Sequence, residues 1–184
     1  MLASVFVGMS LDGFIARPDG RFDFLHSAEA GPHGYEEFIA TVDALLIGRG
    51  TYEVVLGMGG WFYGKKPVFV LSSRELAPAP KEAVVERLSG EPRGVAAQLD
   101  ARGIHHVYVD GGLTVQSFLE AGLIDRVIIN RVPVLIGSGI PLFGPLSRDI
   151  PLRHIATRVL QGGGVQSEYH LGDVKGLAAL WRSA

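Results

Sequence analysis

The sequence predicts an α/β domain built around a mostly parallel sheet. Helical patterns alternate with short apolar runs, and the runs at residues 44–47, 68–71 and 107–109 contain only apolar residues. Continuous apolar runs of this length are typical of strands that are covered on both faces. Residues 152–172 combine two strand-like segments with a Gly-Gly-Gly turn, which predicts a C-terminal β-hairpin.

Length and composition favour one domain over residues 1–184. The chain is 47% hydrophobic and 20% charged, and neither a shift in composition nor a repeat divides it. A chain of this size can bury a core and form a pocket.

The first third of the chain predicts two strand–helix alternations. Residues 4–9 are rich in β-forming side chains, and the strand resumes at 14–16 after a polar turn. Apolar residues recur at helical spacing over 35–42, before the apolar run at 44–47. A second helix is expected at 51–56, where glycines follow.

The middle of the chain continues the alternation. A strand at 68–73 has a polar end, and helices are expected at 84–88 and 95–101 because Gly90, Pro92 and Gly94 separate two helix-like segments. The strand that ends in Val-Asp-Gly-Gly repeats the pattern of an apolar run followed by glycines.

The last third predicts one more helix before the hairpin. Thr114 is a good N-cap for the helix that follows it, and Gly122 can adopt the left-handed conformation at its end. Residues 126–137 resemble a strand, and the proline-rich segment at 138–151 predicts a surface loop.

Charge and composition argue against several classes of partner. The formal net charge is -2, and Lys and Arg are scattered, so nucleic acid is not expected. The absence of cysteine excludes disulfides, thiolate catalysis and cysteine-bound zinc. His105 and His106 should point to opposite faces of a strand, and no His-x-x-x-His spacing occurs, so no metal site is expected.

The beginning of the chain does not read as a membrane segment. It is apolar, yet it has no basic n-region and reaches Asp12 too early for a signal peptide or membrane span. We expect a soluble, cytoplasmic protein with no membrane partner.

Three predicted strands end in residues suited to binding an anion. They end at Gly48-Arg49-Gly50-Thr51, at Ser72-Ser73-Arg74 and at Gly111-Gly112. In an α/β sheet such ends line a common crevice, and the free N–H groups of a following helix favour a phosphate there. Each motif alone is more often an ordinary turn. Together they suit a dinucleotide with an additional phosphate, because arginine matches phosphate geometry.

At these residues the chain resembles the dihydrofolate reductase superfamily. It is most similar to the C-terminal reductase domain of the bifunctional riboflavin-biosynthesis deaminase/reductase and its stand-alone relatives. The resemblance rests on five stretches in family order: MSLDGFIA (9–16), DALLIGRGTYE (43–53), PVFVLSS (67–73), VYVDGGLTVQSFLEAGLID (107–125) and PVLIGSGIPLF (133–143). It implies a three-layer dihydrofolate reductase-like fold with helices on both faces of the sheet.

The resemblance also implies a cofactor and its site. The cofactor is NADPH rather than NADH, and hydride chemistry must come from a cofactor because no side chain supplies it. Gly8 and Ile15 match positions near the nicotinamide. The remaining cofactor positions, which match phosphate and adenosine contacts, are Gly48, Arg49, Gly50, Thr51, Leu71, Ser72, Ser73, Arg74, Asp110, Gly111, Gly112, Leu113, Thr114 and Val115.

The substrate half of the site is less defined. Asp110 stands where the riboflavin enzymes have a glutamate or similar group near the substrate ribose, and Glu36 and Glu37 are candidates for the acidic residue that dihydrofolate reductases use to bind a pterin. Asp110 and Glu37 are therefore the catalytic candidates. Trp61, Phe62 and Tyr63 could stack on a ring or belong to the core or a subunit contact, and Asp12 is most simply a turn former.

The predicted function is reduction of a small heterocycle by NADPH, similar to the 5-amino-6-(5-phosphoribosylamino)uracil reductase step. The alternatives are a dihydrofolate or pterin reductase and a non-catalytic NADP-binding protein of the same fold. The absence of cysteine leaves no zinc deaminase site in this sequence. A homodimer is expected, with residues 127–137 and the C-terminal hairpin as apolar edges.

Overall fold

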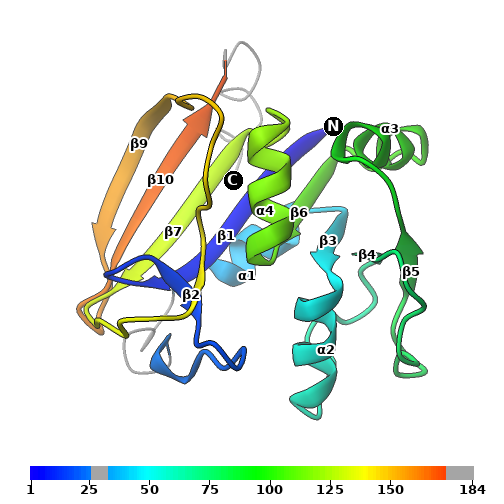
Figure 1. Cartoon of the computed structure of the whole chain (residues 1–184), viewed down its shortest axis with the longest axis horizontal. Helices are drawn as coiled ribbons and strands as arrows, with labels where there is room; N and C mark the ends of the chain where they lie inside the picture. The colour runs from blue at the N-terminus through cyan, green and yellow to red at the C-terminus, as the bar shows by residue number, and fades with distance from the viewer. Residues whose placement is uncertain (26–32, 173–184) are drawn as a thin grey trace.

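An eight-stranded sheet forms the centre of the molecule. In the computed structural model, which describes residues 1–25 and 33–172, the strand order is β5-β4-β3-β6-β1-β7-β10-β9 (Figure 1). The strands from β5 to β7 are parallel to their neighbours, whereas β10 is antiparallel to β7 and to β9. The predicted mostly parallel sheet with a C-terminal hairpin is therefore confirmed.

Apart from β5 and the short strand β8, the elements follow one another along the chain in the order that the sequence predicted. The strands are β1 (Leu2–Ser10), β2 (Phe14–Ala16), β3 (Ala44–Gly48), β4 (Val68–Leu71), β5 (Val85–Leu88), β6 (His106–Asp110), β7 (Arg126–Val132), β8 (Ile140–Pro141), β9 (Leu152–Val159) and β10 (Val165–Leu171). The α-helices are α1 (Tyr35–Thr41), α2 (Arg49–Gly57), α3 (Pro92–Ala101) and α4 (Gly112–Glu120), with a 3₁₀ turn at Asp23–Leu25. Strands β2 and β8 form a separate small sheet.

The sheet is covered on both faces. Val95 of α3 and Phe118 of α4 share one buried cluster, whereas Phe38 of α1 and Tyr52 of α2 belong to another. In Figure 1, α4 lies in front of the sheet and α1 behind it. Both faces of β3 are thus covered, and its residues 44–47 have no exposed surface. This explains why the central strands are apolar throughout.

Residues 84–88 contradict the sequence-based prediction. They were expected to form a helix, but residues 85–88 form strand β5, which pairs in parallel with β4 from Val68↔Val85 to Leu71↔Leu88. A segment this short makes too few helical hydrogen bonds to persist alone, whereas the exposed edge of β4 satisfies its backbone. Tertiary pairing therefore decides the structure of this segment.

The beginning of α4 also differs from the prediction. Thr114 was expected to be the N-cap, but the helix begins at Gly112 and the N-cap is Gly111. The end of α4 is as predicted, because Gly122 has a φ of 67° and its N–H and that of Leu123 donate to Leu119 and Phe118. Helix α4 begins earlier than predicted because the positive φ of Gly111, 93°, lets the chain turn directly from β6 into the helix.

Strand β7 is not an edge. It was expected to offer an apolar edge for a second subunit, but it lies between β1 and β10 and is paired on both sides. The edge on this side of the sheet is β9, which is exposed along its whole length. No helix within the described ranges, 1–25 and 33–172, is long and apolar enough to cross a membrane.

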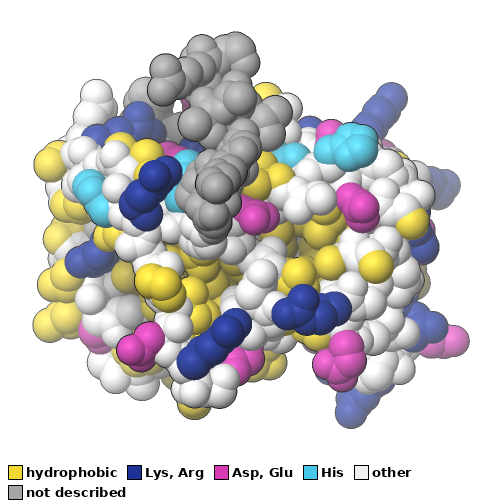
Figure 2. All heavy atoms as spheres, turned by 90° about the horizontal axis from the view of Figure 1, so that it is seen from above, with side chains coloured by type: hydrophobic (Ala, Val, Ile, Leu, Met, Phe, Trp, Pro, Cys, Tyr) yellow, Lys and Arg dark blue, Asp and Glu magenta, His cyan; other side chains and the backbone are white. Residues whose placement is uncertain are grey.

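The described surface carries mixed charge. On the face seen in Figure 2, basic and acidic side chains are interspersed and do not separate into regions of one sign. This distribution agrees with the small net charge and gives a polyanion no extended basic surface on this face.

Candidate functional site

A cavity of about 1090 Å³ lies at the carboxyl ends of the parallel strands. Its lining comes from the ends of β1, β3, β4 and β6, from the first turns of α2 and α4, and from the segment around β2. The volume slightly exceeds the usual range of small-molecule pockets, roughly 300–1,000 Å³. The cavity can therefore hold a dinucleotide together with a small second molecule.

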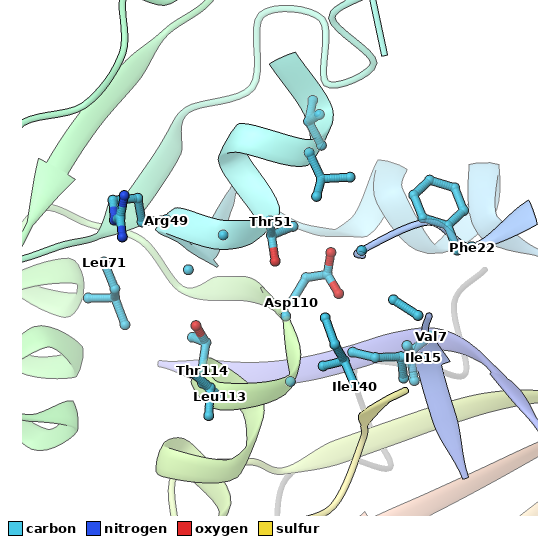
Figure 3. Close-up of a pocket in the computed structure, with 18 of the residues that line it drawn as sticks. Val7, Ile15, Phe22, Arg49, Thr51, Leu71, Asp110, Leu113, Thr114 and Ile140 are labelled. Atoms are coloured by element: carbon cyan, nitrogen blue, oxygen red, sulfur yellow. The ribbon is translucent and has the colours of Figure 1, made fainter. Parts of the chain in front are cut away.

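The order of the strands in the sheet sets the order of the lining residues along the cavity. Leu71 ends β4, Arg49 follows β3, Asp110 ends β6, and Val7 belongs to β1, so these residues follow one another across the sheet. Figure 3 shows Arg49 and Leu71 at one end, Val7, Ile15 and Phe22 at the other, and Asp110 between them. We call these two ends the arginine end and the ring end.

Two helices begin side by side in the middle of the cavity. The N-caps of α2 and α4 are Gly48 and Gly111, at the ends of the neighbouring strands β3 and β6, and neither end has a side-chain cap. The first N–H groups of a helix have no partner within the helix, and the helix dipole favours negative charge beside them. Two such ends side by side have the polarity that suits adjacent negative charges, such as those of two phosphates.

The two helix starts are packed against each other through threonine. The side chain of Thr51 in α2 contacts Gly111, and the side chain of Thr114 in α4 lies so close to Gly48 that an added Cβ there would be 2.8 Å from its Oγ1. A Cβ at Gly112 would lie 2.9 Å from the Pro141 carbonyl oxygen. The glycines are therefore required by the close packing around the two helix starts.

The contact between Gly48 and Thr114 allows a test of this packing. Gly48 has a φ of -77°, which any residue adopts, so the substitution Gly48→Ala is opposed only by the Thr114 hydroxyl. We expect Gly48→Ala to lower the free energy of unfolding by about 1–3 kcal/mol. Thr114→Ala should restore about 1 kcal/mol or more in the double variant. Denaturant unfolding of all four proteins measures the coupling; strictly additive effects contradict the proposed contact.

The arginine end is built by the turn after β4. The Ser72 hydroxyl donates to the carbonyl of Arg74 at 2.7 Å and accepts from its N–H at 3.0 Å, so Ser72 holds the turn while Ser73 and Arg74 are exposed. Arg49 pairs with Glu53 one turn along α2, with 2.6 Å between Nη1 and Oε1. Because this pair is partly exposed, it stabilises the fold little and can open for a stronger anion.

Asp110 is a carboxyl group in an unusual environment. Burial raises its pKa to about 6, and a hydrogen bond from the Gly111 backbone N–H only partly opposes that rise. The pKa of Tyr35 is raised to about 12, first by burial and then by the charge of Asp110, and the pKa of Tyr63 is raised by the same two causes. Near neutral pH, Asp110 can therefore hold and release a proton beside two neutral phenols.

The ring end is mainly apolar and aromatic. Figure 3 shows Val7 of β1, Ile15 of β2 and Phe22 around it. Tyr63 lines the cavity and packs edge-on against Trp61, with 5.3 Å between the ring centroids. Phe62 also lines the cavity and is 59% exposed, whereas Trp61 packs against the buried cluster of α1 and α2. Of the three aromatic residues, Phe62 and Tyr63 thus face the cavity.

Nearly all the predicted cofactor positions lie together. Every one of them except Val115 lines the cavity: Gly8, Ile15, Gly48, Arg49, Gly50, Thr51, Leu71, Ser72, Ser73, Arg74, Asp110, Gly111, Gly112, Leu113 and Thr114. Val115 is 1% exposed, because its side chain belongs to the buried cluster between α4 and the sheet.

Glu37 lies away from the cavity. It lines a smaller cavity of about 460 Å³ together with Arg126, Arg158 and Glu168, next to β9 and β10. Tyr35, two residues earlier in α1, is the residue that reaches the main cavity. Side chains two positions apart in a helix point about 200° apart, so both cannot face the same cavity. The structure thus removes Glu37 from the ring end.

Sequence reasoning missed Phe22, His33 and Tyr35 as lining residues. Tyr35 could have been found, because it begins a helix that directly precedes a central strand. Asp12 does not line the cavity; its carboxylate accepts hydrogen bonds from the N–H groups of Ile136 and Gly137 and so fixes the loop after β7. Among the residues in 1–25 and 33–172, no group of three His, Asp or Glu side chains is placed to hold a metal ion.

Comparison of the sequence with known proteins places the chain in a protein family. A family model described as the RibD C-terminal domain matches residues 4–163. An uncharacterised protein of Bacillus subtilis, YwjB, is 34% identical over 168 residues, which cover 90% of this chain and 95% of that protein.

Solved structures agree with this result. The crystal structure of a candidate riboflavin biosynthesis protein from Shewanella sp. PV-4 is 38% identical, covers 94% of this chain and 100% of its own, and has a TM-score of 0.88. A dihydrofolate reductase from Enterococcus faecalis complexed with NADP(H) shares the fold at 17% identity, with 94% and 97% coverage and a TM-score of 0.61.

Proposed function

This chain belongs to the RibD C-terminal domain family, and from that membership we propose that it is an NADPH-dependent reductase of a small heterocyclic substrate. The observation that carries the proposal is the pair of uncapped helix N-termini beside a carboxyl group whose pKa is about 6. The first feature suits a pyrophosphate, and the second supplies a proton next to the place where a ring would lie.

The residues of the cavity fit this cofactor. Helices α2 and α4 would hold the pyrophosphate at their N-termini, which have no side-chain cap and whose glycines Gly48 and Gly111 line the cavity. Ser73 and Arg74, both exposed at the arginine end, would bind the 2′-phosphate that distinguishes NADPH from NADH. Gly8 and Ile15 would lie along the nicotinamide.

The reduction requires a hydride and a proton. When bound, NADPH would supply the hydride, which would go to a C=N or C=O carbon of the substrate. Asp110, in its protonated form, would give the proton to the nitrogen or oxygen of that bond and be left as the carboxylate, which solvent reprotonates. Val7, Ile15 and Phe22 would exclude water and hold the ring in position.

A homodimer remains part of the proposal. Edge strand β9 carries the exposed side chains Leu152, Ile155 and Val159, the last of them 77% exposed. An exposed apolar edge strand is a site for pairing with another chain. Light scattering determines the molecular mass, and replacing Val159 by Lys should shift a β9-mediated dimer toward the monomer.

The cofactor assignment is tested by comparing NADPH with NADH. NADPH should quench tryptophan fluorescence and raise the melting temperature more than NADH does. Arg74→Ala should weaken NADPH by on the order of 10- to 100-fold, about 1.5–3 kcal/mol for a lost charge-assisted contact, and NADH much less. Arg148→Ala, at an exposed loop position that does not line the cavity, is the control. Equal affinities for the two cofactors contradict the assignment of the 2′-phosphate.

A further inference from the structure

We infer that Tyr35 and Tyr63 position the substrate by donating hydrogen bonds from their phenolic hydroxyls to carbonyl oxygens on one edge of its ring. The inference rests on the proposed function, because it concerns the part of the same cavity that lies beyond the cofactor. It is carried by a contrast between these two tyrosines and two others that pack in the same buried cluster.

The tyrosines of this cluster differ in what their hydroxyls bind. The buried cluster of α1 and α2 contains Tyr35, Tyr52, Tyr63 and Tyr108. Tyr52 and Tyr108 donate to backbone carbonyl oxygens, at 2.9 Å and 2.7 Å. Within the part of the chain that the structure describes, the hydroxyls of Tyr35 and Tyr63 make no hydrogen bond. A buried tyrosine hydroxyl ordinarily has a partner, so these two hydroxyls are suited to bind a ligand of the cavity.

Aromatic contacts hold the ring of Tyr35 at the cavity. Tyr35 is the first residue of α1, and its side chain belongs to the cavity lining. The ring packs edge-on against Phe6, with 5.6 Å between the centroids, and against Tyr108, with 6.4 Å. Such contacts fix the orientation of a ring without using its polar group. The hydroxyl of Tyr35 is therefore presented on a rigid support.

Tyr63 is supported in a similar way by the segment after α2. Its ring lies edge-on to Trp61, with 5.3 Å between the centroids and an angle of 89° between the planes. Trp61 is itself held, because its Nε1 donates to the Gly64 carbonyl oxygen at 3.1 Å and its ring packs against Tyr52 at 6.4 Å. Tyr63 also lines the cavity. Two separate segments of the chain thus bring a phenol to the same cavity.

Burial and nearby charge keep both hydroxyls protonated. Burial is the first cause that raises the pKa of both tyrosines, and the charge of Asp110 is the second. The charge of Tyr35 raises the pKa of Tyr63 further, so the three groups lie close enough to interact. A neutral phenol can donate a hydrogen bond, and the protonated form of Asp110 is a third donor. Ring carbonyl oxygens match these donors, because they accept hydrogen bonds and carry no proton of their own.

Removal of each hydroxyl tests its role in binding. Uracil, a ring that carries carbonyl oxygens, is titrated into the NADP⁺-loaded protein, in which no hydride can be transferred, and binding is followed by ligand-detected NMR. We expect Tyr35→Phe and Tyr63→Phe each to raise the dissociation constant about 5- to 20-fold, because a buried carbonyl loses its partner. Tyr169→Phe, on β10 and outside the cavity lining, is the matched control and should change it less than about twofold.

Two results of this titration overturn the inference. One is a dissociation constant that stays within about twofold of the wild-type value in either cavity variant. The other is a wild-type protein that shows no saturable binding of uracil up to about 50 mM.

Thermal unfolding separates a positioning role from a structural one. Without ligand, Tyr35→Phe and Tyr63→Phe should leave the melting temperature within about 1 °C, because neither hydroxyl is bonded in the described protein. Tyr52→Phe loses its hydrogen bond and should lower the melting temperature by about 2–4 °C. It should not change uracil binding, because Tyr52 does not line the cavity. Cavity variants that lose stability as Tyr52→Phe does and bind uracil normally overturn the inference.

The two proposals fail in different ways. If NADP⁺ and NADPH do not bind the wild-type protein, the proposed function fails, and the inference about the tyrosines fails with it. If the cofactor binds, but Tyr35→Phe and Tyr63→Phe weaken the cofactor and leave uracil binding unchanged, the proposed function stands. In that case the hydroxyls bind the cofactor, and only the inference about the substrate is wrong.

Discussion

Asp110→Asn should lower kcat by about 10²–10³-fold while the protein remains folded and binds NADPH. The amide occupies the same space but has no proton to give to the reduced bond, and a positioned general acid contributes about this factor. Steady-state NADPH oxidation measures the loss. Asp149→Asn, at an exposed position in a loop, is the matched control and should change kcat by less than about twofold.

The pH dependence of kcat should follow the protonation of Asp110. Because Asp110 acts in its protonated form and its pKa is about 6, kcat should be highest below pH 6 and should fall about tenfold per pH unit above it. The Asn variant should lack this dependence. A wild-type kcat that is flat from about pH 5 to pH 8 argues against Asp110 as the proton donor.

The stability of the same variant provides an independent check. The pKa of Asp110 rises from 3.8 to about 6 on folding, so the folded state binds the proton more tightly than the unfolded state. The stability that this provides is present below about pH 4 and is lost as the pH rises through 6. At about pH 8, Asp110→Asn should therefore raise the free energy of unfolding by on the order of 2–3 kcal/mol. Near pH 4 the same substitution should change the free energy of unfolding little.

Gly111→Ala should have the second large effect, on both stability and cofactor binding. Gly111 has a φ of 93°, and an added Cβ would also meet the side chain of Thr51. Strain of this kind costs on the order of 1–3 kcal/mol, and the overpacking adds to it. We expect a loss of about 2–4 kcal/mol in the free energy of unfolding, and NADPH binding should weaken because the start of α4 moves.

Two further variants separate the causes at Gly111. Thr51→Ala removes the hydroxyl but leaves the positive φ, so it should restore only part of the lost stability, unlike the rescue of Gly48→Ala by Thr114→Ala. Gly57→Ala is the control, because Gly57 ends α2, an added Cβ there would meet no atom within 4 Å, and its φ is not positive. That change should be neutral or slightly stabilising. Full recovery with Thr51→Ala indicates that packing alone, and not the backbone, requires a glycine at position 111.

Much of the fold could be predicted because the sequence pattern and the burial agree. The run at 44–47 is apolar since both faces of β3 are covered, and the hairpin was visible from its glycine turn. Residues 85–88 were predicted wrongly because their structure depends on the free edge of β4. Such an edge comes from a distant part of the chain, which local propensity does not include.

By itself, the sequence determined the local chemistry of this protein: which strands are buried, where glycines end them, and which residues could bind phosphates. Only the tertiary structure decided which of these residues meet. It brought the starts of α2 and α4 together, removed Glu37 from the cavity, and placed Tyr35 and Tyr63 near Asp110. The physical reason is that burial at a site depends on strands and helices that are distant in the sequence, and this burial raises the pKa of Asp110.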